Sequence, residues 1–154
     1  TKVFDSAQIP GEIMDLFVVN TATLKANPAL GKALVGAWYE IMTTMSAQDA
    51  KGIAARTAMA KASSTDLAGF ESQLKTTKMF YTPASAVELA KSDALLATMK
   101  KVAEFSFSHG LLGEKAKDAA SIGVEGPKGV YGDSKNVKLR FDTTYMQMAA
   151  DNKL

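Results

Sequence analysis

One short apolar run near the start of the chain sets the strongest constraint on its fold. Residues 13–19 are apolar except for Asp15, and the second half of the run is aromatic and β-branched. A run of this length and composition favours a buried strand over a helix. A buried strand needs neighbouring strands and covering helices, so the run predicts that this chain contributes to a sheet.

Helical signals dominate the residues that follow. Asn27 before Pro28 is a typical helix start, because proline lacks an N–H group that the first turn would leave unpaired. Apolar side chains then recur at steps of three and four, which places them on one face of a helix. We expect this face to be buried; it consists of Leu30, Leu34, Trp38, Ile41 and Met45.

Capping residues predict further helix starts along the chain. These lie at Ser46, with Asp49 as a capping-box partner, at residues 63–65, at Thr82 before Pro83, at Ser92 and at Thr143 or Thr144. The helix after Ser92 has an apolar stripe and a natural stop at Gly110. We expect the stripe to face inward; it consists of Leu95, Met99, Val102 and Phe105.

The last third of the chain predicts a loop followed by a strand. Residues 123–132 are rich in glycine with one proline, which is typical of a loop, and residues 126–129 lack the spacing of a phosphate-binding loop. Residues 137–142 alternate apolar and charged side chains, as a half-buried strand does. The chain therefore reads as predominantly helical with a few short strands near its ends. Two such strands form no stable sheet alone, so we expect further sequence to supply their partners.

Composition narrows the functional classes. The 154 residues are 47% hydrophobic and carry a net charge of +2, which suits a folded domain and gives no basic footprint for nucleic acid. Cysteine is absent and His109 is the only histidine, so a thiolate or multi-histidine metal site is excluded.

His109 beside Gly110 is best interpreted as a helix-end residue. No nucleophile, base and acid recur in a catalytic pattern, so we expect neither an enzyme nor a cofactor.

Two stretches are similar to a known family. Residues 4–20, followed by Asn27-Pro-Ala-Leu and Ala37-Trp-Tyr-Glu, resemble the late part of ABC-importer solute-binding proteins in the nitrate, sulfonate, taurine and thiamine-precursor group. Residues 102–113 are similar to the penultimate helix of that family. Residues 129–133, 137–142 and 145–146 resemble its urea-carboxylase-associated subgroup, which is linked to urea or, more plausibly, to guanidine-like compounds.

The resemblance implies an α/β parent protein with the two-lobed periplasmic-binding-protein fold, of which this chain is the C-terminal part. Residues 1–15 would cross the hinge and form a loop from the second lobe. Residues 16–154 would contribute the returning strand and the C-terminal helices of the first lobe. Ligand would be clamped by lobe closure.

The resemblance also implies a set of ligand-binding residues near the hinge. Ser6 would donate its hydroxyl, and the backbone at Pro10 and Gly11 would approach the ligand. Glu12 or Asp15 would pair with a guanidinium-like group. From spacing alone, Glu12 and Asp15 are equally compatible with solvated loop charges, which are the commoner case.

The partners implied are a small polar solute, such as a urea-like, guanidine-like, sulfonate or nitrate compound, and an ABC permease in the membrane, with the chain in the periplasm or cell envelope. An alternative hypothesis is a self-standing helical interaction domain that docks a partner through Trp38, Ile41 and Met45. An unpaired strand edge in the chain also predicts a homo-oligomer.

Overall fold

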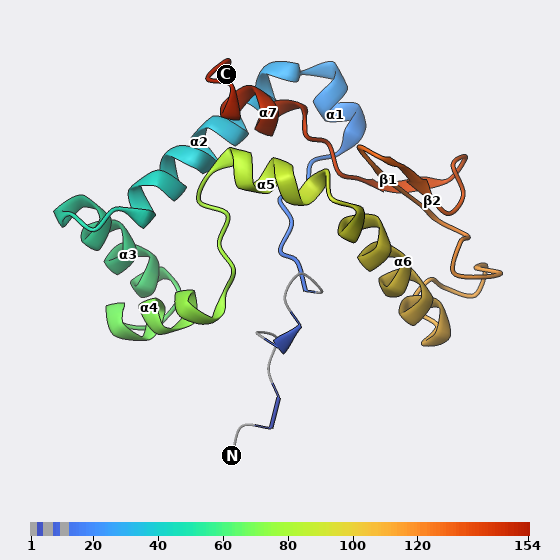
Figure 1. Cartoon of the computed structure of the whole chain (residues 1–154), viewed down its shortest axis with the longest axis horizontal. Coiled ribbons are helices and arrows are strands. Elements are labelled where there is room, and N and C mark those ends of the chain that lie inside the picture. Colours follow the sequence, from blue (N-terminus) through green and yellow to red (C-terminus); the bar gives the residue numbers. More distant parts are fainter. Residues whose placement is uncertain (1–2, 5–7, 10–12) are drawn as a thin grey trace.

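A computed structural model describes residues 3–4, 8–9 and 13–154. Its described part is mostly helical and carries one small mixed sheet (Figure 1), in agreement with the predominantly helical class expected from sequence. In chain order the elements are α1 (Thr21–Ala26), α2 (Pro28–Ser46), α3 (Ala50–Ala62), α4 (Leu67–Thr76), α5 (Pro83–Ala90), α6 (Asp93–Ser108), β1 (Gly123–Gly126), β2 (Gly129–Tyr131), β3 (Val137–Arg140) and α7 (Thr144–Ala150).

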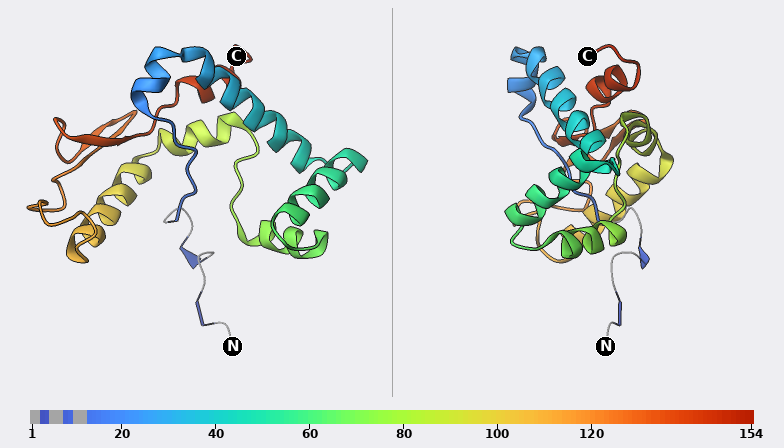
Figure 2. Two further views of the ribbon diagram at one scale, coloured as in Figure 1. Left: turned by 180° about the vertical axis from the view of Figure 1, so that it is seen from behind. Right: turned by 90° about the vertical axis from the view of Figure 1, so that its left-hand side faces the viewer.

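The elements form an open arch with two arms (Figures 1 and 2). Helices α2, α3 and α4 make one arm, and α6 with the sheet makes the other. Helices α5 and α7 pack on each other where the arms meet, and α7 also contacts α2. Residues 13–20, which precede α1, run down between the arms.

Local capping chemistry explains where most helices begin. Asn20 starts α1, because its side chain accepts hydrogen bonds from the N–H groups of Ala22 and Thr23. Pro28 opens α2 as predicted. Thr82 and Ser92 cap α5 and α6, which confirms both predicted starts.

Two predicted caps are wrong by one to three residues. Ser46 is still the last residue of α2, and its hydroxyl donates to the Thr43 carbonyl. The cap of α3 is Asp49, which accepts from the N–H of Gly52 at 2.9 Å. The cap of α4 is Asp66, just beyond residues 63–65. In both places a carboxylate takes the capping position, which it fills as well as serine does while adding favourable charge at the helix N-terminus.

The buried strand predicted at residues 13–19 does not form. These residues belong to no helix or strand. Four of the apolar side chains are exposed, with accessible fractions of 43–70%: Ile13, Leu16, Phe17 and Val18. The prediction failed because the three described strands pair only with one another, so this run has no strand partner among the described residues.

The buried face of α2 differs from the predicted one. Tyr39, Met42 and Met45 form the core cluster, whereas Trp38 and Ile41 are 43% and 47% exposed. Apolar residues occupy more than one face of this helix, so periodicity cannot select the buried one. Neighbours from α3, α4, α5 and α7 select it by packing on the cluster; they include Met59, Phe70, Ala86 and Met146. Burial raises the pKa of the Tyr39 phenol.

Helix α6 shows the same partial agreement. Leu95 and Met99 are buried as predicted, and Ala103 joins them. Val102 and Phe105 are instead 42% and 58% exposed. The helix ends at Ser108, and Gly110 follows with a φ of 71°, which confirms the predicted stop.

The glycine-rich stretch predicted as a loop forms a hairpin. Strands β1 and β2 pair antiparallel around a turn at residues 127–128. Strand β3, predicted correctly in outline, pairs with β1 in parallel, so the sheet order is β2-β1-β3. Gly123 is required by close packing, because a Cβ there would overlap the Asp133 carbonyl oxygen. Glycine usually weakens strands, so composition pointed to a loop.

The observed burial of α2 predicts unequal effects of two neighbouring substitutions. Met42→Ala should lower the free energy of unfolding by about 2–4 kcal/mol, because it opens a cavity in the core cluster. Ile41→Ala should lower it by less than about 1 kcal/mol, because Ile41 is half exposed. Urea unfolding followed by circular dichroism measures both, and a loss from Ile41→Ala as large as that from Met42→Ala would contradict the observed burial of α2.

Candidate functional site

Four of the five expected ligand-binding residues lie outside the described part of the chain: Ser6, Pro10, Gly11 and Glu12. Asp15 is described, and its side chain is exposed. It has no ion-pair partner among the described residues. The structure therefore places Asp15 where a ligand could reach it, but brings no other described polar group to it.

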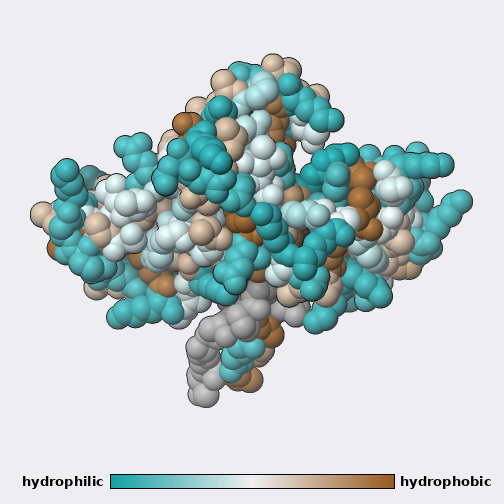
Figure 3. All heavy atoms as spheres, turned by 45° about the horizontal axis from the view of Figure 1, so that its top comes forward, coloured by the Kyte–Doolittle hydropathy of each residue, from teal (hydrophilic) through white to brown (hydrophobic). Residues whose placement is uncertain are grey.

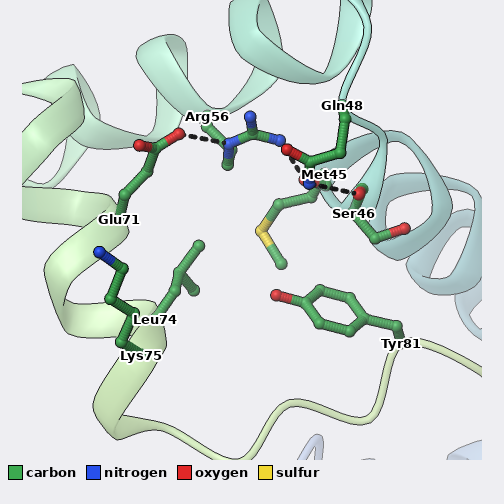
Figure 4. A pocket seen from close by; sticks show the side chains of 8 residues that line it. All are labelled: Met45, Ser46, Gln48, Arg56, Glu71, Leu74, Lys75 and Tyr81. Carbon is green, nitrogen blue, oxygen red and sulfur yellow. Dashed lines mark hydrogen bonds and ion pairs between the residues drawn. The ribbon is translucent and has the colours of Figure 1, made fainter.

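A shallow hollow lies in the arm formed by α2, α3 and α4 (Figure 4). Its volume is about 280 Å³, and it is wide open to solvent. The lining mixes apolar, hydroxyl and charged side chains: Met45, Ser46, Gln48, Arg56, Glu71, Leu74, Lys75 and Tyr81.

Arg56 lines one wall of this hollow and is the one buried charged side chain among the described residues. Its Nη1 donates to the Met45 carbonyl at 2.8 Å and to the Ala47 carbonyl at 2.7 Å. Its Nε donates to Glu71 Oε1 at 3.0 Å. The two carbonyls stand at the C-terminus of α2, where no helical N–H remains to pair with them. Arg56 thus joins the end of α2 to α3 and α4, and its charge suits that helix end.

The turn between α2 and α3 is packed tightly around the same carbonyl. A Cβ on Gly52 would overlap the Ala47 carbonyl oxygen that Arg56 binds. Glycine at this position lets the first turn of α3 approach the end of α2. The approach brings Arg56, one turn further along α3, within reach of both carbonyls.

The other polar groups of the hollow are partly committed to local structure. Gln48 donates to the Ser46 carbonyl at 3.1 Å, and the Ser46 hydroxyl is bound to Thr43. Lys75 is exposed, and the Tyr81 hydroxyl points into the hollow (Figure 4). The arrangement offers hydrogen bonds to a small polar molecule. It offers no nucleophile held by a base, and its main ionic contact is best explained as structural.

Sequence reasoning missed Arg56, although a signal was present. Only two of the eighteen basic residues are arginine, Arg56 and Arg140. Arg140 also forms an ion pair, from its Nε to Glu125 Oε2 at 2.8 Å, across β3 and β1. Arginine suits such positions because its planar fork keeps several donors in fixed directions. Both arginines of this lysine-rich chain thus form ion pairs that join different elements.

His109 occupies the position expected of a helix-end residue. Its ring stacks on Phe105 with 4.0 Å between centroids, and its Nδ1 lies 2.9 Å from the Phe105 carbonyl oxygen. The described residues contain no group of three or more metal-binding side chains. None of the helices described is long and apolar enough to cross a membrane.

Comparisons with known proteins leave the family open. No protein-family model matches the chain, and neither a curated protein nor a solved structure gave a match.

The contacts of Arg56 predict a large structural effect of its removal. Arg56→Ala should lower the free energy of unfolding by about 2–3 kcal/mol, because it leaves two helix-end carbonyls and Glu71 without their donor. Lys51→Ala, on the exposed side of α3, is the matched control and should change it by less than about 0.5 kcal/mol. Urea unfolding of both variants tests this prediction. Equal free energies of unfolding would show that Arg56 does not hold this arm together.

Proposed function

We propose that this chain is the C-terminal part of a periplasmic solute-binding protein that serves an ABC importer. In this proposal the whole protein has two lobes, binds a small polar solute between them by closure, and delivers it to a permease in the membrane. The observation that carries the proposal is the exposed apolar segment at residues 13–19. A segment of this composition is suited to the interior of a sheet, and the described part of the chain leaves it uncovered.

The positions of the helices support the same proposal. Helix α2 begins at Pro28, in the Asn-Pro motif that carries the resemblance. Helix α6 ends at Ser108, just before the Gly-Leu-Leu motif at residues 110–112. These boundaries agree with those that the resemblance implies for helices covering a first lobe.

Incomplete burial is a further support. Exposed apolar side chains occur on α2 and α6 as well as before α1, and they include Trp38, Ile41, Val102 and Phe105. In Figure 3, hydrophobic side chains interrupt the polar surface at several places. Helices that cover another lobe need apolar surface on the side that meets it.

The solute in this proposal is cationic or rich in hydrogen-bond donors, such as a guanidine-like or urea-like compound. Asp15 supports this choice, because its carboxylate is exposed and free of ion pairs with the described residues. A carboxylate can accept two parallel hydrogen bonds from a planar guanidinium group. A sulfonate or nitrate would instead be repelled by it.

Exposure of α2 favours a second candidate, a helical interaction domain. Trp38 and Ile41 are roughly half exposed, and the Phe17 ring lies 6.0 Å from the Trp38 ring. Aromatic and aliphatic side chains grouped in this way are common at the centre of protein interfaces. Capture of a partner protein that Trp38→Ala abolishes, with no response to solutes, would favour this candidate.

A thermal-shift screen tests the solute-binding proposal. The complete product of the reading frame is heated with guanidinium, urea, taurine or nitrate at millimolar concentration. A ligand at a hundred times its Kd stabilises the folded state by about 2.7 kcal/mol, so the expected result is a higher Tm with guanidinium or urea. Asp15→Asn should remove the shift, whereas Glu114→Gln, another exposed acid, should keep it. A rise in Tm with taurine or nitrate alone would show that Asp15 is not part of the binding site. An unchanged Tm with every solute would contradict the proposed function.

A further inference from the structure

The hydroxyl of Tyr81 stands in the hollow of the α2–α4 arm without a protein partner. Its ring packs on the core cluster of Tyr39, Met42 and Met45, which fixes the position of the phenol. The hydroxyl points across the hollow toward α4 (Figure 4), and it forms no hydrogen bond with another described residue. A phenol both donates and accepts, so this group can bind a polar atom of a small molecule in the hollow.

Lys75 is a second polar group of the lining that lacks a partner. Glu71 stands four residues before it on α4, and this spacing and order favour an ion pair along a helix. Glu71 instead pairs with Arg56, whose Nε lies 3.0 Å from Oε1. Lys75 is exposed and forms no ion pair with another described residue. The structural pair at Arg56 thus leaves an ammonium group available beside the hollow.

The charges that line the hollow favour an anion. Arg56 and Lys75 are positive and Glu71 is negative, so one positive charge of the lining is uncompensated. A single carboxylate would balance it and would accept hydrogen bonds from the Lys75 ammonium and the Tyr81 hydroxyl. A cation would meet an unfavourable charge here, and a dianion would leave a negative charge in excess.

Apolar side chains define the rest of the ligand. Met45 and Leu74 lie among the polar groups of the hollow in Figure 4. A short alkyl group would cover them, which is favourable in proportion to the apolar area removed from water. The volume of about 280 Å³ is at the lower limit of ligand pockets, and the hollow is open to solvent. These dimensions suit a small ligand that binds weakly.

We propose that this hollow binds a short-chain monocarboxylate, such as propionate or butyrate. The carboxylate lies between the Lys75 ammonium and the Tyr81 hydroxyl, and the alkyl chain lies on Met45 and Leu74. Asp15 is not among the residues that line the hollow. The inference therefore goes beyond the proposed function and does not depend on it.

An amide NMR titration of the 154-residue chain with acetate, propionate and butyrate tests the site. Sodium chloride keeps the ionic strength constant, so that each carboxylate competes against a simple anion. Saturable shifts should appear at residues 46–48, 71–75 and 81, with dissociation constants in the millimolar range. Each added CH₂ group should lower the dissociation constant about twofold, which is less than the roughly fourfold effect of full burial because the hollow is open.

Substitutions assign the binding to the two unpaired groups. Lys75→Gln should raise the dissociation constant about fivefold, because it removes a charge-assisted hydrogen bond, and Tyr81→Phe about threefold, because it removes a neutral one. Lys51→Gln, an exposed cation of α3 outside the lining, is the matched control and should change nothing. Asp15→Asn should also change nothing, which separates this site from the solute-binding proposal. Far-UV circular dichroism shows that each variant remains folded.

Three results would overturn the proposal. The first is a set of amide shifts that stay linear throughout the millimolar range for all three acids, which would mean no binding beyond that of chloride. The second is a dissociation constant that is the same in folded Lys75→Gln and Tyr81→Phe as in the original chain. The third is saturation confined to amides outside the hollow, which would place the binding elsewhere.

Discussion

The fork of hydrogen bonds from Arg56 holds together the arm that carries the core cluster of α2. It joins the carbonyl end of α2 to α3 and, through Glu71, to α4. Met45, whose carbonyl it binds, belongs to the buried cluster of α2. Residues of α5 and α7 also pack on that cluster, so the two helices that lie where the arms meet are attached to this arm. A helix end without such a donor would leave buried carbonyls unpaired.

Sequence predicted what depends on neighbouring residues and failed where distant ones decide. The starts at Pro28, Thr82 and Ser92 and the stop at Gly110 follow from local hydrogen bonding and were correct. The buried face of α2 depends on four other helices, so its periodicity was not enough. The hairpin at 123–131 was missed because Gly123 serves close backbone packing and Gly129 takes a positive φ in the turn, and composition reveals neither role. Of the expected ligand residues only Asp15 is described, and Arg56 was found by its contacts.

The proposed function depends on the apolar segment at residues 13–19. Its composition is that of a buried strand, and its backbone has no hydrogen-bond partner among the described residues. In a two-lobed solute-binding protein it would enter the sheet of the first lobe. The proposal thus rests on one requirement, that apolar strands and their backbone groups be covered.

Residue-resolved hydrogen exchange tests this account most directly, because it compares the junction at Arg56 with the unpaired segment in one experiment. The account predicts that amides of α2 and α3 around Arg56 exchange slowest. Amides of residues 16–19 should exchange as in an unstructured peptide when the chain is dilute, because none of them donates to another described residue. Protection of residues 16–19 in the dilute chain would contradict the account, as would junction amides that exchange as fast as that segment.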